Sequence, residues 1–152
     1  MFDNIYWGFI LWKLFTKGRE IKITASGRLP DGQKVSTSTK FRIKDIPKPS
    51  GFFRGKSGSF TLPKSSLERG SVSAVLEDFD FDLPLETKSF RFRAPGQPSV
   101  VVTGAKLNSK VLSMLKRIKS GQSIIISDIN VIIPTNPSYK LKQTTPISIT
   151  IN

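Results

Sequence analysis

The sequence of 152 residues contains neither cysteine nor histidine. Without cysteine, the chain can form no disulfide and no thiolate metal site. Without histidine, it lacks the commonest general base, the commonest partner in a catalytic triad and the commonest ligand of transition metals. Carboxylates and lysines remain for acid–base chemistry. We therefore expect a protein that is not an enzyme and that binds no metal or other cofactor.

Acidic residues are scarce beside basic ones, with 11 Asp and Glu against 24 Lys and Arg and a formal net charge of +13. A surplus of this size attracts nucleic acid, an anionic membrane face or an acidic protein. The basic residues are spread along the chain and form no long run of the kind found in nucleic-acid-binding tails. We expect the charge to face solvent or a protein partner, and nucleic acid is the disfavoured alternative.

Long hydrophobic runs are also absent. The most apolar segment, Ile5–Trp12, ends at Lys13 and is well short of the roughly 20 residues that cross a bilayer. We expect no membrane span in this chain, and we find no basic region or cleavage site of an export signal. Residues 1–18, which hold both tryptophans, are interpreted as an aromatic-rich segment that precedes the domain or as an interfacial anchor.

A turn signal separates two alternating runs near the N-terminus. Residues 19–26 alternate in part, residues 35–43 alternate again, and Pro30-Asp31-Gly32 stands between them. This pattern predicts a β-hairpin. We interpret residues 19–40 as an N-terminal hairpin that is a remnant of a preceding β-domain, and residues 41–152 as a further domain.

Two helices are expected within residues 41–152. The first is short and lies within Thr61–Gly70, with Thr61 or Leu62 at its cap and Pro63 in its first turn. The second has about three turns, begins at Asn108 or Ser109 and has an apolar stripe formed by Val111, Leu112, Leu115 and Ile118.

Strands are expected at residues 71–76, 79–83, 100–103, 123–133 and 146–151. Most of the connections between them are short turns, which join antiparallel neighbours. The prediction is an α+β fold, a largely antiparallel β-sheet or sandwich with the two helices packed on it.

A second hairpin is predicted from two alternating runs, Phe79–Leu83 and Phe90–Arg93. With the turn centred on Glu86-Thr87, Asp82 faces Arg91 and Asp80 faces Arg93. Each exposed ion pair contributes only about 0.2–1 kcal/mol, so these pairs would set the register more than the stability. The alternative roles of the acidic side chains in Phe79–Leu83 are to bind a metal ion or to act as a pair of catalytic carboxylates. A straight strand disfavours both roles, because it spreads the carboxylates apart.

Residues 50–59 hold three glycines and two cations, Arg54 and Lys56, and they predict a mobile basic loop. Their spacing matches neither of the common glycine-rich phosphate-binding motifs. Phe52 and Phe53 precede the cations, and aromatics in such a place stack on bases, anchor protein interfaces or pack in a core. We predict that Phe52, Phe53, Arg54 and Lys56 contact a partner, because loops on a rigid sheet often carry recognition.

Several segments occur in an order that matches one family. Phe41–Pro49 reads FRIKDIPKP and Ala74–Leu83 reads AVLEDFDFDL. They are accompanied by Gly55–Gly58, Ser89-Phe90, the helix around Leu115 with Lys119 and Gly121, Ile126–Ile129, and Pro146–Ile149. The ordered set resembles the C-terminal domain of the gliding-motility protein family GldM, also called PorM, over residues 41–152.

The resemblance implies a non-catalytic, periplasmic protein-binding module of the type IX secretion and gliding machinery in Bacteroidota, associated with the inner membrane in full-length members. It implies docking on the GldK–GldN (PorK–PorN) ring, hence GldN-like and GldK-like partners, and it allows a homodimer. A GldL-like partner is implied only for a chain that carries the family's N-terminal region. That region has no counterpart here, so we expect a fragment, a split gene product or a short paralogue.

Overall fold

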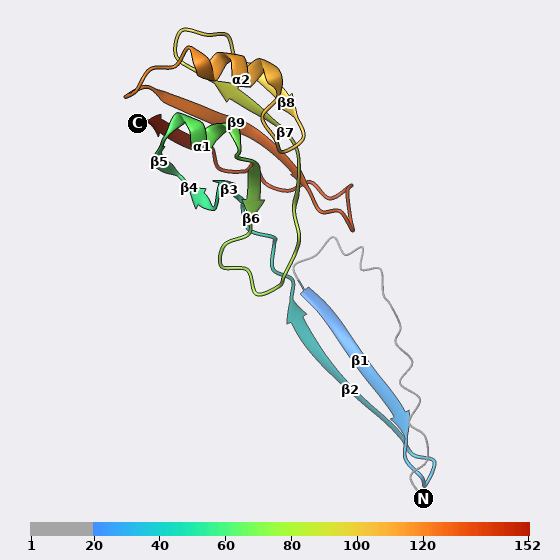
Figure 1. Ribbon diagram of the computed structural model, residues 1–152. Coiled ribbons are helices and arrows are strands. Elements are labelled where there is room, and N and C mark those ends of the chain that lie inside the picture. Colours follow the sequence, from blue (N-terminus) through green and yellow to red (C-terminus); the bar gives the residue numbers. More distant parts are fainter. Residues whose placement is uncertain (1–19) are drawn as a thin grey trace, which may run out of the picture. The chain divides into compact units, whose positions relative to one another are not determined.

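The computed structural model of the chain describes residues 20–152 (Figure 1). The aromatic-rich segment of residues 1–18 lies outside the described residues. The chain divides after Asp45 into two units, Met1–Asp45 and Ile46–Asn152. No helix within residues 20–152 combines the length and the apolar character that a bilayer span needs.

The first unit contains an antiparallel hairpin of β1 (Glu20–Arg28) and β2 (Lys34–Arg42). Its turn is closed by two bonds from backbone N–H groups, Leu29 to the Gln33 carbonyl (2.8 Å) and Gln33 to Asp31 Oδ1 (2.9 Å). Gly32 supplies the positive φ of +84° that the turn requires. The hairpin predicted from Pro30-Asp31-Gly32 is therefore confirmed, and β2 lies within one residue of the run expected at residues 35–43.

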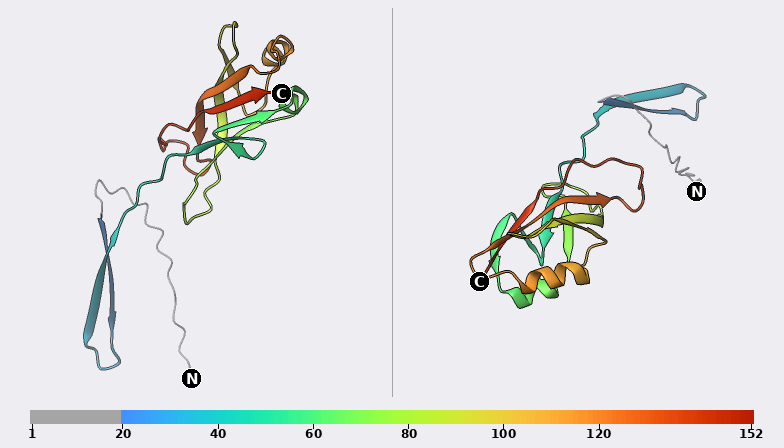
Figure 2. Two further views of the ribbon diagram at one scale, coloured as in Figure 1. Left: turned by 90° about the vertical axis from the view of Figure 1, so that its left-hand side faces the viewer. Right: turned by 90° about the horizontal axis from the view of Figure 1, so that it is seen from above.

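The second unit contains two sheets and two helices (Figures 1 and 2). The larger sheet has the strand order β5 (Ser59–Leu62), β10 (Ile147–Ile151), β9 (Ser123–Ile132), β7 (Glu86–Arg93) and β8 (Val100–Thr103). The smaller has the order β4 (Lys56–Ser57), β3 (Ser50–Phe53) and β6 (Val72–Val75). All pairs are antiparallel except β5–β10. The predicted α+β class with largely antiparallel sheets is confirmed.

The two helices, α1 (Lys64–Glu68) and α2 (Ser109–Lys116), lie side by side (Figure 2). Pro63 occupies the N-cap position of α1, because the expected cap residues belong to β5. Asn108 caps α2, where its Oδ1 accepts a hydrogen bond from the Val111 N–H at 3.0 Å. At the end of α2, the Ile118 N–H reaches back three residues to Leu115. With this tighter turn the helical path has the predicted length of about three turns.

One hydrophobic core joins both sheets and both helices of the second unit. Its largest fully buried side chains are Phe53, Leu67, Phe90, Phe92, Leu115, Ile124, Ile126, Ile147 and Ile149. These residues come from six different strands and helices that are far apart in the sequence. The second unit is therefore held together by contacts between distant segments.

A β-bulge divides β9 into two halves. Ile124 and Ile126 are buried in the first half and Ile129 and Val131 in the second, so the alternation shifts by one residue between them. Asp128 lies at the shift with φ +48°, where the register with β7 is irregular. The bulge keeps both halves of the strand facing the same core.

The predicted hairpin of Phe79–Leu83 with Phe90–Arg93 is wrong. The second run does form a strand within β7, with Phe90 and Phe92 buried. The first run forms no strand and lies in the connection between β6 and β7. Both edges of β7 are already paired, one with β8 and the other with β9, so no edge remains for Phe79–Leu83.

The ion pairs predicted for that hairpin do not form across strands, because Asp80 and Asp82 are not on a strand. The Arg91 Nε atom pairs with Asp128 Oδ2 at 2.6 Å, across from the β9 bulge. Arg93 faces Ile125 of β9. The positive φ of +56° at Asp78 breaks the extended path just before the predicted strand.

Candidate protein-binding surface

Residues 50–57 form a tight hairpin, so the prediction of a mobile loop is wrong. Phe52 pairs with Ser57 and Phe53 with Lys56, which leaves Arg54 and Gly55 as a two-residue turn. Their φ angles are +50° and +75°, as in the turns that match the twist of paired strands. The signal was missed because Arg-Gly is not one of the usual dipeptides of such turns.

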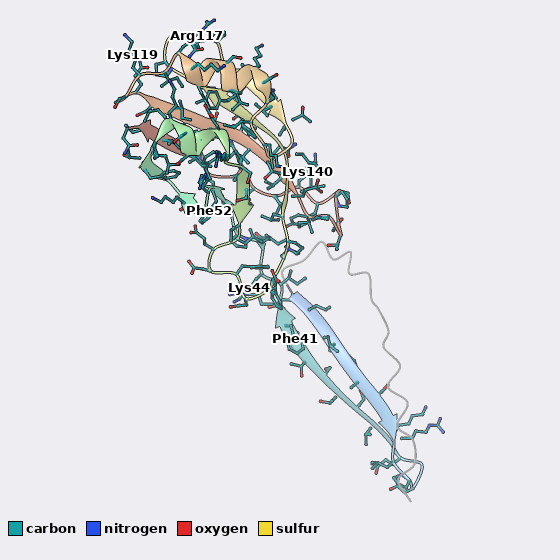
Figure 3. The ribbon with its side chains drawn as sticks, viewed as in Figure 1. Phe41, Lys44, Phe52, Arg117, Lys119 and Lys140 are labelled. Atoms are coloured by element: carbon teal, nitrogen blue, oxygen red, sulfur yellow. The ribbon has the colours of Figure 1, made fainter. Side chains whose placement is uncertain are left out.

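The two phenylalanines of β3 point to opposite faces, as adjacent strand residues do. Phe53 has no exposed surface, and its ring lies against Gly70, where a Cβ would come within 2.0 Å of the Phe53 Cζ atom. The prediction that Phe53 contacts a partner is therefore wrong, because it is a core residue. Phe52 is half-buried on the other face of the β3–β4 hairpin and is labelled in Figure 3.

Arg54 and Lys56 are exposed at the tip of the β3–β4 hairpin, and both are held by neighbours. The Arg54 Nη1 atom donates to the carbonyl oxygen of Ser66 in α1 at 3.1 Å. The Lys56 Nζ atom lies 5.9 Å from the centroid of the Phe60 ring, within reach of a cation–π interaction. These contacts restrict the two cations and still leave them open to solvent.

A second group of cations lies at the C-terminal end of α2. The Lys64 Nζ atom, which comes from α1, donates to the carbonyls of Lys116 (3.0 Å) and Ile118 (2.8 Å). It thereby satisfies carbonyls that the helix end leaves unpaired, and it opposes the negative end of the helix dipole. Around it Lys116, Arg117 and Lys119 are exposed, and the last two are labelled in Figure 3.

α1 connects these two groups, because it contacts Arg54 through Ser66 and the end of α2 through Lys64. We call the combined region the basic surface, formed by Arg54, Lys56, Lys64, Lys116, Arg117 and Lys119. Glu68 is an acidic residue on the same helix, so the region is predominantly and not uniformly positive. Such a surface speeds encounter with an acidic partner and favours it over a basic one.

Sequence reasoning identified Arg54 and Lys56 but not the α2 group as contacts. The crowding of cations in the last turn of α2 was visible in the sequence as a match to the helix dipole. The contribution of Lys64 was not, because it depends on two helices that are more than forty residues apart in sequence meeting in space. No pattern within a short stretch of sequence predicts the contact of Lys64 with the end of α2.

The connection between β6 and β7 has the opposite character. Four of the chain's eleven acidic residues lie within Glu77–Asp82, and a fifth, Glu86, is the first residue of β7. Glu77 Oε2 accepts a hydrogen bond from the Ser50 hydroxyl. The Phe79 and Phe81 rings pack edge to face with centroids 5.5 Å apart, and Phe81 is 72% exposed. Within residues 20–152, no three side chains of metal-binding type are placed to hold an ion, which a metal site in this acidic segment would need.

Comparison with known proteins gives one family. The model of the GldM C-terminal domain matches residues 47–152. This range covers almost all of the second unit, and the hairpin of β1 and β2 precedes it. The search of curated proteins gave no match. The resemblance inferred from the ordered motifs is confirmed over the matched range.

Proposed function

Since this chain belongs to the GldM C-terminal domain family, we propose that it is a non-catalytic, periplasmic protein-binding module that docks on the GldK–GldN (PorK–PorN) ring. The family makes the chain a module of the gliding and type IX secretion machinery. The match to residues 47–152 is the observation that carries the proposal. Docking on the ring is what the resemblance to the family implies for this domain.

The basic surface supports the proposal as the region of contact. Exposed cations at the β3–β4 turn and at the end of α2 would meet acidic side chains of the partner and raise the rate of association more than the final affinity. Arg54 and Lys56 are already restrained by Ser66 and Phe60, so binding would immobilise them at a smaller entropic cost than free side chains. Phe52, half-buried beside them, is the proposed apolar contact.

The composition supports a role without catalysis. The chain has no histidine and no cysteine, so it supplies neither the usual general base nor a thiol nucleophile. The ion pair of Arg91 with Asp128 lies beside the β9 bulge. We propose that the acidic residues of the second unit have structural and recognition roles of this kind.

The direct test is capture of purified GldN-like and GldK-like proteins by the full chain. We expect capture at low ionic strength and weaker capture as salt rises, because the Debye length falls from about 10 Å at 0.1 M to about 3 Å at 1 M. Failure to capture either protein at low salt would contradict the proposal. Binding to DNA and RNA, measured in parallel, is expected to be weak, and a steep salt slope there would favour the nucleic-acid alternative.

A further inference from the structure

The two halves of β9 differ in how many neighbouring strands they have. β7 pairs with β9 from Ile125 to Ile132, whereas β10 pairs only with Ser123–Ile126. Within residues 20–152, no strand pairs with the other edge of Asp128–Ile132. An unpaired edge presents a row of backbone N–H and C=O groups, to which another extended chain can bind. The second half of β9 therefore has room for one more strand.

A cleft of about 270 Å³ lies along this edge. We call it the β9 cleft; one wall is Asp128–Val131 of β9, and the other is Leu141–Thr144 of the β9–β10 connection. Consecutive strand residues point to opposite faces, so a cleft that touches four in a row lies at the edge of the strand and not on one face. A water molecule takes up about 30 Å³ in the liquid, so the cleft is far larger than a single water needs.

The wall opposite β9 is held by other parts of the second unit. The Thr145 N–H donates to the Pro49 carbonyl at 3.0 Å, and Thr145 Oγ1 accepts a hydrogen bond from the Gly51 N–H at 2.9 Å. Leu141 packs against the hydrophobic core. In the described part of the chain, no hydrogen bond joins Leu141–Thr144 to β9. These contacts keep the two walls apart, so the cleft stays open.

The polar groups of the cleft indicate what it would bind. Thr144 is only 3% exposed, and its Oγ1 atom has no hydrogen-bond partner within residues 20–152. Such a hydroxyl gains a bond when a ligand supplies a polar group. Lys142 is exposed and forms no ion pair with the described residues, whereas the Asp128 carboxylate is already paired with Arg91 at 2.6 Å. The cleft therefore favours a ligand with a negative charge.

We propose that the β9 cleft binds an extended acidic segment of another protein as an added strand. Backbone hydrogen bonds to the free edge of β9 provide the affinity, and a carboxylate beside Lys142 provides selectivity. The Thr144 hydroxyl bonds to a polar group of the segment. The four-residue wall is about 13 Å long, which suits a segment of four or five residues, and β-branched residues favour the extended form. The cleft lies outside the basic surface, so this inference does not depend on docking to the ring.

The probe is the acetylated peptide amide TVEVTV, titrated into the isotope-labelled full chain and followed by amide chemical shifts. We expect saturable shifts at Asp128–Ile132 and Leu141–Thr144. The peptide TVKVTV, which has lysine in place of glutamate, should bind at least about fivefold more weakly. Two further probes carry N-methyl groups at the odd or the even positions. At least one of them should lose binding, because it lacks the N–H groups that would bond β9.

Variants of the chain test the two polar contacts separately. T144V should weaken binding of TVEVTV several-fold without lowering the thermal midpoint, because the hydroxyl has no partner in the free chain. The matched control is T103V, since Thr103 is exposed on β8, and it should leave the affinity unchanged. K142E should reverse the preference and bind TVKVTV more tightly than TVEVTV. R54E/K56E should bind TVEVTV as the wild type does.

Four outcomes would overturn the proposal. They are the absence of shifts at millimolar TVEVTV, shifts centred outside the β9 cleft, equal affinity for the two peptides, and tolerance of both N-methylated probes. Signals of the cleft that change with protein concentration in the free chain would assign the cleft to a second copy and overturn it too. Capture of the GldN-like protein by T144V should equal that of the wild type. Peptide binding without any capture would contradict the proposed function alone.

Discussion

The two units of the chain differ in how far apart in the sequence their paired strands lie. In β1–β2 the paired strands are adjacent in sequence, and the turn at Pro30-Asp31-Gly32 fixes the register. In Ile46–Asn152 several strand pairs join segments that are distant in the sequence, such as β5 with β10 and β7 with β9. Every buried hydrophobic side chain within residues 20–152 belongs to the second unit.

This difference between the units shows that the two folds depend on different interactions, one on residues adjacent in the sequence and the other on residues far apart. The hairpin is specified by a few turn residues but buries almost nothing by itself, so its stability depends on what covers it. The second unit gains its stability from a shared core, which no single turn specifies. Substitutions of buried residues in the second unit should therefore have large effects on stability, and substitutions in the hairpin should have small ones.

The largest effect is expected for Phe53→Ala. Truncating a fully buried phenylalanine should lower the free energy of unfolding of the second unit by about 3–5 kcal/mol. Phe52→Ala, one residue earlier and half-buried, is the matched control and should lower it by clearly less. Urea unfolding followed by far-ultraviolet circular dichroism measures both. Equal losses would mean that β3 does not present these two faces as described.

A glycine pair compares the two units directly. Gly70→Ala places a Cβ within 2.0 Å of the Phe53 ring and should cost roughly 1–3 kcal/mol, because the core must shift to make room. Gly27→Ala in β1 meets no atom within 4 Å and should change stability by less than about 0.5 kcal/mol. Thermal unfolding of both variants is the measurement. A loss for Gly27→Ala as large as that for Gly70→Ala would contradict the contrast.

A smaller effect is expected at the start of α2. Asn108→Ala removes the side-chain cap of the Val111 N–H and should cost about 1 kcal/mol. Ser109→Ala, at the next position, retains the cap and should be nearly neutral. Denaturant titration distinguishes the two. A neutral Asn108→Ala would show that the cap does not contribute to the stability of the second unit.

The smallest effect concerns the ion pair at the β9 bulge. A double-mutant cycle of Arg91→Gln with Asp128→Asn should give a coupling free energy of about 0.2–1 kcal/mol, reduced by salt, because the two side chains are 37% and 48% exposed to solvent. The cycle of Arg91→Gln with Asp82→Asn should give none, since Asp82 is not on a paired strand. Coupling in the second cycle alone would restore the hairpin predicted from alternation.

The same contrast explains what the sequence could predict. The turn of β1–β2 and the cap at Asn108 are local signals, and both predictions were confirmed. Phe79–Leu83 also alternates, but a strand needs the free edge of a neighbouring strand. Both edges of β7 are occupied, one by β8 and the other by β9. Alternation of apolar and polar residues shows that a segment can form a strand with one buried face. It does not show whether a neighbouring strand has a free edge to pair with it.

The candidate surface shows the same limit. The exposure of Arg54 and Lys56 followed from their position beside glycines in a turn. The burial of Phe53 did not, because it depends on Gly70, which follows α1 in the sequence, lying against the Phe53 ring. Likewise, the contact of Lys64 with the end of α2 joins two helices that are distant in the sequence.

The central claim is that the second unit binds its partner through the basic surface. Calorimetric titration of the full chain with a GldN-like protein tests it with two variants of equal charge change, R54E/K56E and K140E/K142E. Lys140 and Lys142 are exposed in the connection between β9 and β10 and are not part of the basic surface. We predict that R54E/K56E weakens binding roughly tenfold or more, and that K140E/K142E stays near the wild-type affinity. Equal weakening by both variants, or unchanged affinity of R54E/K56E, would contradict the claim.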